Sequence, residues 1–318
     1  MKQVRVTSPE DEVIASWYEK ATVRYTPRIL VPSYVSDEPI FPVARSIICT
    51  HPLVVSRGRE ARDYLLTQAA YQFLYGIALV ETRFVIDCCL NIIHNRIKGA
   101  TDLEKLQALT VIVDEGYHAH VALDYIIQMK QRSGVEPILV PNSNRKLDAA
   151  TRAYASLPES LHMDFQLLAV TLAESVLTDE IAHIGREEDL LKSFTQVMTD
   201  HVRDEGRHSN YFAKLMKSNW AQLSEETQLR FGAMLPDYLD DFLGISKKRT
   251  YERKVLHSCG FADDAVAQII GDTDPQFVAE QNGLAEKQKV RLLRLLKQIG
   301  VLDLEPNHRA FSNRSYMT

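Results

Sequence analysis

The sequence predicts an all-α protein with four long helices at its centre. Glycine and proline, which often end helices, number 13 and 12 among 318 residues, and few of them fall within 57–133 or 158–219. Apolar residues in these two blocks recur with the 3.6-residue period of a helix face. No pair of segments shows the alternation and turn residues of paired strands. Each block is therefore expected to hold two long helices.

Before residue 57 the sequence predicts a short helix followed by an irregular arm. Ser8 is a candidate N-cap, Pro9 suits a first helical turn, and the acidic residues 10–12 favour the positive end of a helix. Between Arg24 and Pro52 five prolines interrupt the chain, and little helical periodicity remains. We therefore expect no regular helix in the arm.

The boundaries of the four long helices follow from local signals. Gly99 is a plausible helix stop, and Thr101 followed by Glu104 is a capping-box pattern. The polar stretch after Gly134 predicts a linker, which Pro158 ends by opening the third helix. The four helices are expected over about 59–97, 102–132, 158–185 and 187–217.

The remaining hundred residues predict additional helices. Ser224 and the acidic residues after it start a helix that reaches about 243, and two weaker helices are expected over about 260–270 and 275–299. The residues from Glu305 on are expected to be frayed. We predict one domain, 1–318, in three parts: the N-terminal helix and arm at 1–56, the four-helix core at 57–219, and additional C-terminal helices at 220–318.

Composition and charge exclude several classes of protein. Hydrophobic residues make up 45% and charged residues 25%, which is ordinary for a globular chain and excludes wholesale disorder. A net charge of -5 makes nucleic-acid binding through bulk charge unfavourable. The longest apolar stretches, such as 73–80, are far too short to span a membrane. Function must therefore come from a local site.

The cysteines and the N-terminus favour a cytoplasmic protein. The four cysteines form no C-x-x-C pair, so neither a disulfide framework nor a cysteine-type zinc site is expected; they are Cys49, Cys88, Cys89 and Cys259. The first residues lack the apolar region of a secretory signal. We therefore expect no membrane partner and a cytoplasmic location.

Acidic and imidazole side chains interrupt the apolar face of each long predicted helix. In chain order they are Glu81, Glu115 and His118, Glu174, and His201, Glu205 and His208. At about 100° per residue, His201 lies about 40° from Glu205 and about 20° from His208 around the helix axis. All three side chains of the fourth helix can therefore reach one place.

Four carboxylates aimed at one core require cations. An isolated buried carboxylate is costly and usually takes up a proton instead. The order Glu, Glu-x-x-His, Glu, Glu-x-x-His is the ligand arrangement of ferritin-like dimetal carboxylate bundles, and four carboxylates neutralise two divalent cations. We therefore predict a ferritin-like four-helix core that binds two metal ions, with His201 as a seventh protein ligand.

An internal repeat supports this prediction. Asp-Glu-Gly-Tyr-His at 114–118 resembles Asp-Glu-Gly-Arg-His at 204–208, and the upstream glutamate lies 34 residues before the first motif and 31 before the second. This pattern indicates two helical hairpins related by a pseudo-twofold axis, each supplying half of a site. Asp114 and Asp204 would orient the ligand imidazoles through the second ring nitrogen.

Glu-x-x-His by itself is weak evidence, because two further matches occur. Glu159 follows Pro158 in a first helical turn, where an acidic residue simply favours the helix dipole, so its pairing with His162 is read as structural. Glu180 and His183 lie off the apolar face of their helix and are expected to form a solvated pair. Neither match is assigned to the metal site.

Four short runs carry a resemblance to a known family. They are Val80-Glu81-Thr82, the run 114–118, Ala173-Glu174-Ser175, and His201-x-x-x-Glu205-x-x-His208. On these residues the chain resembles the p-aminobenzoate N-oxygenase family of non-haem diiron proteins, over roughly 40–245. His201 separates this family from plain ferritin-like bundles, which carry two histidines.

The resemblance implies a function and its cofactors. It implies two iron ions, for which manganese could substitute, and O2 as co-substrate, with no cofactor beyond the metals. The activity would be oxygenation of a primary amine to a hydroxylamine, and onward to nitroso or nitro, in secondary metabolism. His201 and Glu205 would be the catalytic ligands. The resemblance also implies a small-molecule amine as substrate, an external electron donor and a homodimer.

The substrate itself stays open between aryl amines and amino-acid derivatives. Three arginines near the predicted ligands could bind a substrate carboxylate, although each is more often a surface residue: Arg83, Arg96 and Arg207. Three tyrosines could line a pocket or simply pack in the core: Tyr71, Tyr75 and Tyr117.

Three other functions stay open. The first is a diiron hydroxylase or desaturase that acts on carbon, the second a ferritin-like iron-handling protein, and the third a metal-free helical interaction protein. The seventh ligand argues against the first. The long arm and C-terminal region argue against the second, because ferritins are much shorter.

Overall fold

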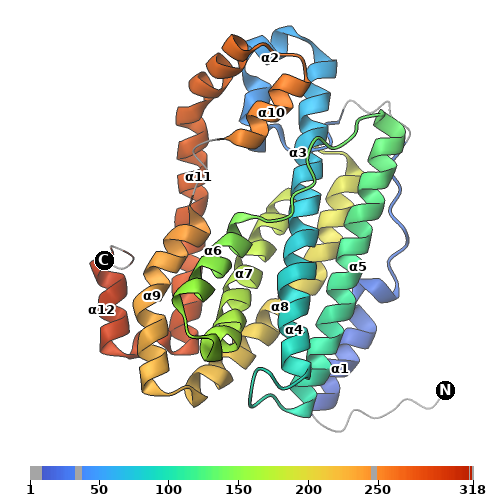
Figure 1. Cartoon of the computed structure of the whole chain (residues 1–318). Helices are drawn as coiled ribbons and strands as arrows, with labels where there is room; N and C mark the ends of the chain where they lie inside the picture. The colour runs from blue at the N-terminus through green and yellow to red at the C-terminus, as the bar shows by residue number, and fades with distance from the viewer. Residues whose placement is uncertain (1–8, 33–37, 245–248, 315, 317–318) are drawn as a thin grey trace, which may run out of the picture.

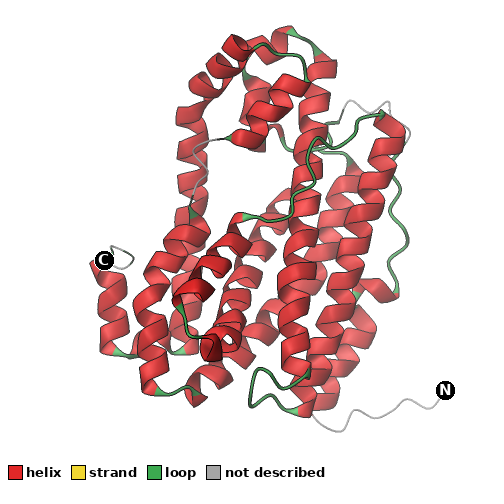
Figure 2. Cartoon of the chain, in the orientation of Figure 1, coloured by secondary structure: helices red, strands yellow, loops and turns green. Residues whose placement is uncertain are grey.

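A computed structural model describes residues 9–32, 38–244, 249–314 and 316 (Figure 1). Its regular elements are all helical, and the described residues contain no strand (Figure 2). This confirms the predicted all-α, ferritin-like fold class. Within the described part of the chain, no helix is both long and apolar enough to cross a bilayer. The division at residues 56 and 219 stays a prediction.

Four long helical segments lie side by side at the centre of the molecule (Figure 1). They are α3 (Arg59–Val80) with its continuation α4 (Ile86–Ile93), α5 (Asp102–Ser133), α7 (His162–Gly185) and α8 (Lys192–Gln222). The apolar core of this bundle has two parts, one containing Phe165 and Phe212, the other Leu74 and Phe194. The predicted metal ligands lie along the helices between these two parts.

The predicted helix over 59–97 is interrupted. Glu81–Val85 form a π-helical turn between α3 and α4, and the helix ends at Ile93. A π turn inserts one residue into the helical repeat and often occurs at functional sites. Here it begins at a predicted metal ligand. Local periodicity did not reveal it, because Phe84 and Val85 remain buried on either reading.

The start and end of α5 follow the predicted capping chemistry. The Thr101 hydroxyl accepts a hydrogen bond from the Glu104 backbone N–H at 3.2 Å, and the Glu104 carboxylate accepts one from the Thr101 N–H at 2.7 Å. Gly134 ends the helix with a φ of 69°, in the left-handed region that glycine adopts readily. The predicted capping box is confirmed.

The predicted linker before residue 157 is wrong, because it contains α6 (Arg145–Ser156). The Asn144 side chain caps this helix by accepting from the Leu147 N–H at 3.1 Å. Small alanines, including Ala149 and Ala153, bury the inner face of α6 against the bundle. Its polar outer face concealed the helix in the sequence.

The C-terminal region is more regular than predicted. The helix expected after Ser224 is confirmed as α9 (Glu225–Leu243). The two weaker helices are wrong as separate elements, because α11 (Asp263–Ile299) is one long helix that contains Pro275. A further helix, α10 (Thr250–Ser258), was not predicted.

The expected fraying from Glu305 on is also wrong over most of its length. These residues form α12 (Glu305–Asn313), whose Phe311 is fully buried. The Asn307 amide donates to the Gln228 carbonyl at 3.2 Å, and a Cβ at Gly232 would collide with the same amide. Tertiary packing against α9 therefore orders this segment.

The N-terminal region packs on the bundle. The first helix, α1 (Pro9–Lys20), starts at the predicted proline, whereas its predicted cap Ser8 lies outside the described residues. The arm contains short 3-10 turns, η1 (Thr22–Arg24), η2 (Val43–Arg45) and η3 (Ile47–Thr50), before the short α2 (Pro52–Ser56). In Figure 1, α1 lies alongside α5.

Candidate metal centre

The seven predicted ligands meet in the middle of the bundle. One group of donors consists of Glu81, Glu115, His118, His201 and Glu205, and a second of Glu115, Glu174, Glu205 and His208. Within each group the donor atoms lie within 4.8 Å of one another. Glu115 and Glu205 belong to both groups, so the geometry describes two adjacent candidate positions for metal ions that share two carboxylates. The four carboxylates are fully buried, and none of the three histidines of the cluster is more than 6% exposed.

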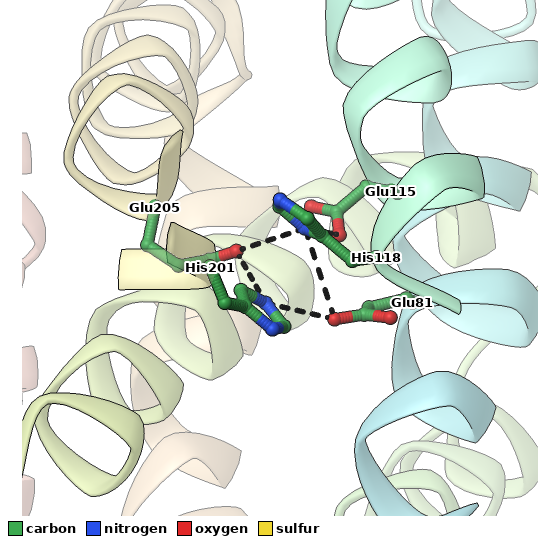
Figure 3. Close-up of side chains that lie close together, drawn as sticks. All are labelled: Glu81, Glu115, His118, His201 and Glu205. Atoms are coloured by element: carbon green, nitrogen blue, oxygen red, sulfur yellow. Dashed lines mark hydrogen bonds and ion pairs between the residues drawn. The ribbon is translucent and has the colours of Figure 1, made fainter. Parts of the chain in front are cut away.

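Each central helix supplies part of the cluster, as the helix phases predict. Figure 3 shows Glu81 of the π turn with Glu115 and His118 of α5 facing His201 and Glu205 of α8. Glu174 comes from α7 and completes the second group. Helices far apart in the sequence therefore aim carboxylates at one point, which is costly unless positive charge lies between them.

The aspartate of each repeat contacts the histidine of the other repeat. Nε2 of His118 lies 3.0 Å from Asp204, and Nε2 of His208 lies 3.1 Å from Asp114. Each imidazole then presents Nδ1 to the cluster, at 3.3 Å and 2.9 Å from Glu115. A carboxylate that accepts the Nε2–H leaves the Nδ1 lone pair free for a metal. The repeat motif suggested the aspartates, but not that each serves the histidine of the other repeat.

The N-terminal region also contacts the two aspartates that hold the histidines. The sequence did not predict these contacts. The Trp17 indole N–H lies 2.9 Å and 3.0 Å from the two oxygens of Asp114. The Thr22 backbone N–H donates to Asp204 at 3.2 Å, and its hydroxyl donates to the same carboxylate. These contacts join residues 97 and 182 positions apart, and no local signal indicates them.

None of the three arginines proposed for substrate binding is free for that role. Arg207 bridges the two aspartates, donating to Asp114 at 3.1 Å and also to Asp204. Arg83 donates to the Asn142 carbonyl, and Arg96 donates to Asn91 at 3.0 Å. Arg207 therefore helps to position the two aspartates that hold His118 and His208.

The three tyrosines differ in their surroundings. Tyr71 is fully buried and donates to the Val135 carbonyl at 2.8 Å, as expected for a core residue. Tyr117 lines a small pocket of about 20 Å³ that also touches His118 and His201. Tyr75 lines neither this pocket nor the cavities of about 460 Å³ and 560 Å³, and it packs half-buried against the apolar core.

His201 differs from the other two histidines. Its Nε2, not Nδ1, faces the cluster, at 2.9 Å from both Glu81 and Glu205. Its ring stacks on that of His118 at a centroid distance of 3.9 Å. No described residue forms a hydrogen bond with its Nδ1. The side chain can therefore reach the same candidate metal position as His118. Unlike His118 and His208, it has no aspartate that accepts a hydrogen bond from its second ring nitrogen.

Burial and mutual charge shift the titration of the cluster in opposite directions. Burial raises the pKa of Glu174 well above its usual range, and neighbouring carboxylates raise it further. Although burial opposes ionisation of Glu205, His201 and His208 hold its pKa well below the usual range. Burial also opposes protonation of the imidazoles, yet the carboxylates around His201 and His208 raise the pKa of both. The buried carboxylates and imidazoles therefore stabilise one another's charged forms against the cost of burial.

Many donor atoms of the cluster also lack hydrogen-bond partners, as expected for atoms that bind metal ions. Sixteen buried side-chain nitrogen and oxygen atoms among the described residues have no hydrogen-bond partner, and nine of them belong to predicted ligands. Both oxygens of Glu81, Glu174 and Glu205 are in this group. Buried polar groups are rarely left unsatisfied, so their concentration here indicates positions for cations. A mixed set of carboxylates and imidazoles suits iron or manganese.

The two further Glu-x-x-His matches, Glu159/His162 and Glu180/His183, lie outside the cluster. Glu159 is exposed in a 3-10 turn, as its structural reading predicts. Glu180 is not part of a solvated pair with His183, which corrects that expectation. It contacts Lys146 at 3.4 Å and accepts from Gln288 at 2.8 Å, because α6 and α11 cover this side of α7.

A comparison with known families agrees with this geometry. A family model described as P-aminobenzoate N-oxygenase AurF matches residues 32–261, which is more than two thirds of the chain and includes all seven predicted ligands. No curated protein sequence matches the chain. The matched range begins after Trp17 and Thr22, so the family comparison does not cover the N-terminal contacts to the two aspartates.

Proposed function

The chain belongs to the P-aminobenzoate N-oxygenase AurF family, and we propose that it is a non-haem diiron oxygenase that N-oxygenates a primary amine. The observation that carries the proposal is the buried cluster of four carboxylates and three histidines, most of whose donor atoms lack hydrogen-bond partners. The product would be a hydroxylamine, with further oxidation to nitroso or nitro, in secondary metabolism. The three-histidine donor set favours this activity over carbon oxidation or iron storage.

The residues divide naturally between two metal positions. Glu81, His118 and His201 would hold one ion, Glu174 and His208 the other, and Glu115 and Glu205 would bridge them. Iron ions held by these residues would supply the electrons and the Lewis acidity that O2 chemistry needs. Asp204 and Asp114 hold the Nε2 protons of His118 and His208, which keeps each Nδ1 available as a donor.

His201 and Glu205 are the proposed catalytic ligands. A neutral third imidazole adds electron donation to one metal position without changing the net charge of the site. Glu205 lies 2.9 Å from Nε2 of His201 and 3.6 Å from Nδ1 of His208, so it connects the two positions. Loss of His201 should therefore change reactivity, whereas loss of Glu205 should change metal binding.

Iron loading and product analysis test the proposal. The metal-free protein is loaded anaerobically with Fe(II), and we expect about two iron ions per chain from the two donor groups. The loaded protein is then exposed to ¹⁸O2 with a panel of primary amines that includes p-aminobenzoate, a longer arylamine and an aliphatic amino acid. Mass spectrometry should find labelled oxygen on nitrogen. Labelled oxygen on carbon would instead support the hydroxylase or desaturase. Uptake of far more than two iron ions would support the iron-storage protein, and no uptake would support the metal-free interaction protein.

Two variants separate reactivity from metal binding. We expect His201→Ala to keep two iron ions and lose most N-oxygenation, because four carboxylates and two histidines remain. Glu205→Ala should lose iron, because it removes a donor common to both positions. If His201→Ala oxidised the amine at the wild-type rate, the seventh ligand would have no catalytic role.

A further inference from the structure

A cavity of about 460 Å³ lies beside the metal centre, between α3, α7 and α11. Its inner wall includes Ile77 and Val80 of α3 and Leu177 of α7. These residues lie within one helical turn of Glu81 or Glu174. The cavity therefore approaches the metal centre from the two helices that contribute only carboxylates, whereas the histidines come from α5 and α8.

The outer part of the cavity is polar. Glu180 follows Glu174 by six residues, which places it about 9 Å further along α7. Lys146 and Gln288 both contact its carboxylate, so its charge is already compensated. Glu252, which also lines the cavity, is bound by the buried Arg249 at 2.7 Å.

Two cationic side chains of the lining, Arg45 and Arg145, have no such contact with any described residue. The guanidinium of Arg45 forms no hydrogen bond or ion pair with any described residue, whereas its backbone N–H donates to Pro42 within the 3-10 turn. Burial lowers the pKa of its guanidinium, and Glu180 and Glu187 oppose this effect only in part. With Arg145 and Lys146 against Glu180 and Glu252, the lining carries one more positive than negative charge, in a chain whose net charge is -5. The cavity is thus suited to an anionic group.

The space between the two ends is wide and aromatic. Five aromatic side chains from different segments of the chain line it: Phe41, Phe73, Phe242, Tyr251 and Phe277. A cavity of about 460 Å³ falls in the range that holds drug-sized ligands. A single benzene ring with two small substituents would fill only a fraction of it.

We infer that this cavity binds the substrate, an extended arylamine of two or more rings whose amine points to Glu81 and Glu174 and whose carboxylate or phosphate binds Arg45. This inference rests on the proposed function for the direction of the amine. It departs from the compound in the family's description, because p-aminobenzoate is too small to fill the cavity. Arg45 is then the residue that determines specificity for the anionic end.

Binding without turnover tests the inference. The protein is loaded with Mn(II) under anaerobic conditions, and three probes are titrated by calorimetry: 4′-aminobiphenyl-4-carboxylate, 4-aminobiphenyl and p-aminobenzoate. The first has both length and charge, the second only length, and the third only charge. We expect the first to bind at least about tenfold more tightly than either of the others.

Variants identify the contacts. Arg45→Met should weaken the biphenyl acid to the affinity of 4-aminobiphenyl and leave 4-aminobiphenyl unchanged. Arg186→Met, which changes an exposed arginine that directly follows α7 and lies outside the cavity, should have no effect. A Cβ at Gly76 would meet no atom within 4 Å, so Gly76→Leu should fill the cavity and abolish binding of both biphenyls. Its metal stoichiometry should stay at the wild-type value, which reports an intact fold.

The outcomes distinguish this inference from the proposed function. Equal affinity for p-aminobenzoate and the biphenyl acid would overturn the size argument, and wild-type affinity in Arg45→Met would overturn the role of Arg45. Unchanged binding in Gly76→Leu would place the ligand elsewhere. If the binding pattern holds but no amine is oxygenated, the cavity is correctly assigned and the proposed function is wrong.

Discussion

Trp17 offers a direct test of whether the N-terminal helix belongs to the metal centre. Its indole N–H contacts both oxygens of Asp114, at 2.9 Å and 3.0 Å, and Asp114 in turn holds His208. Trp17→Phe removes this donor and keeps an aromatic ring. Arg207 still contacts Asp114 at 3.1 Å, so the carboxylate keeps one cationic partner.

The expected effect follows from the strength of that contact. A hydrogen bond to a charged group contributes about 1.5–3 kcal/mol, and loss of an outer partner of a metal ligand lowers metal affinity about 10–100-fold. Because Arg207 remains, we expect Trp17→Phe near the lower limit, about tenfold weaker binding. Thr22→Val should have a smaller effect, since the Thr22 backbone N–H still donates to Asp204.

The assay is anaerobic competition for Fe(II) or Mn(II) against a chromophoric chelator. Trp220→Phe is the matched control, because it changes the only other tryptophan, which packs near Phe231 away from the cluster. We expect the control to keep wild-type affinity. If Trp17→Phe bound metal as tightly as the control, the N-terminal helix would be a neighbour of the site and not a part of it.

Three further results are expected. Glu174→Ala should lose metal, whereas Glu180→Ala and His183→Ala should keep two ions per chain by metal analysis, because only Glu174 lies in the donor cluster; the reverse pattern would contradict the placement of α7. Metal loading should release protons to a pH indicator, because in the metal-free protein the surrounding carboxylates raise the pKa of the three histidines against the effect of burial, and burial raises the pKa of Glu81 and of Glu174. Apparent metal affinity should therefore fall as the pH is lowered, and a pH-independent affinity would refute this charge balance. Light scattering at micromolar concentration should give the mass of a homodimer, and a monomer would refute that proposal without affecting the enzyme assignment.

The ligand set could be predicted because it follows from local helical geometry. The spacing of His201, Glu205 and His208 decides that they share a face, whatever the helix packs against. The capping box at Thr101 is equally local, since its two hydrogen bonds join residues three positions apart. An acidic group on an apolar helix face is also informative from the sequence alone, because its burial is too costly to be accidental.

Errors in the prediction occurred where packing overrides local signals. The residues of α12 look polar and terminal, yet Phe311 and Asn307 are buried against α9. Likewise, α6 shows a polar face in sequence and is helical because its alanines fit against the bundle. In both segments, the energy that orders the helix comes from residues far away in the chain.

The tertiary structure alone decided how the site is completed. The exchange of Asp114 and Asp204 between the two repeats depends on how α5 and α8 cross, which the repeat motif does not encode. Trp17 reaches Asp114 across 97 residues, and Arg45 reaches the cavity from a segment with no helical pattern. Which donors face the core could therefore be predicted, since helical periodicity acts over a few residues. The partners of those donors and the shape of the cavity arise from contacts between distant segments, and only the folded chain brings these together.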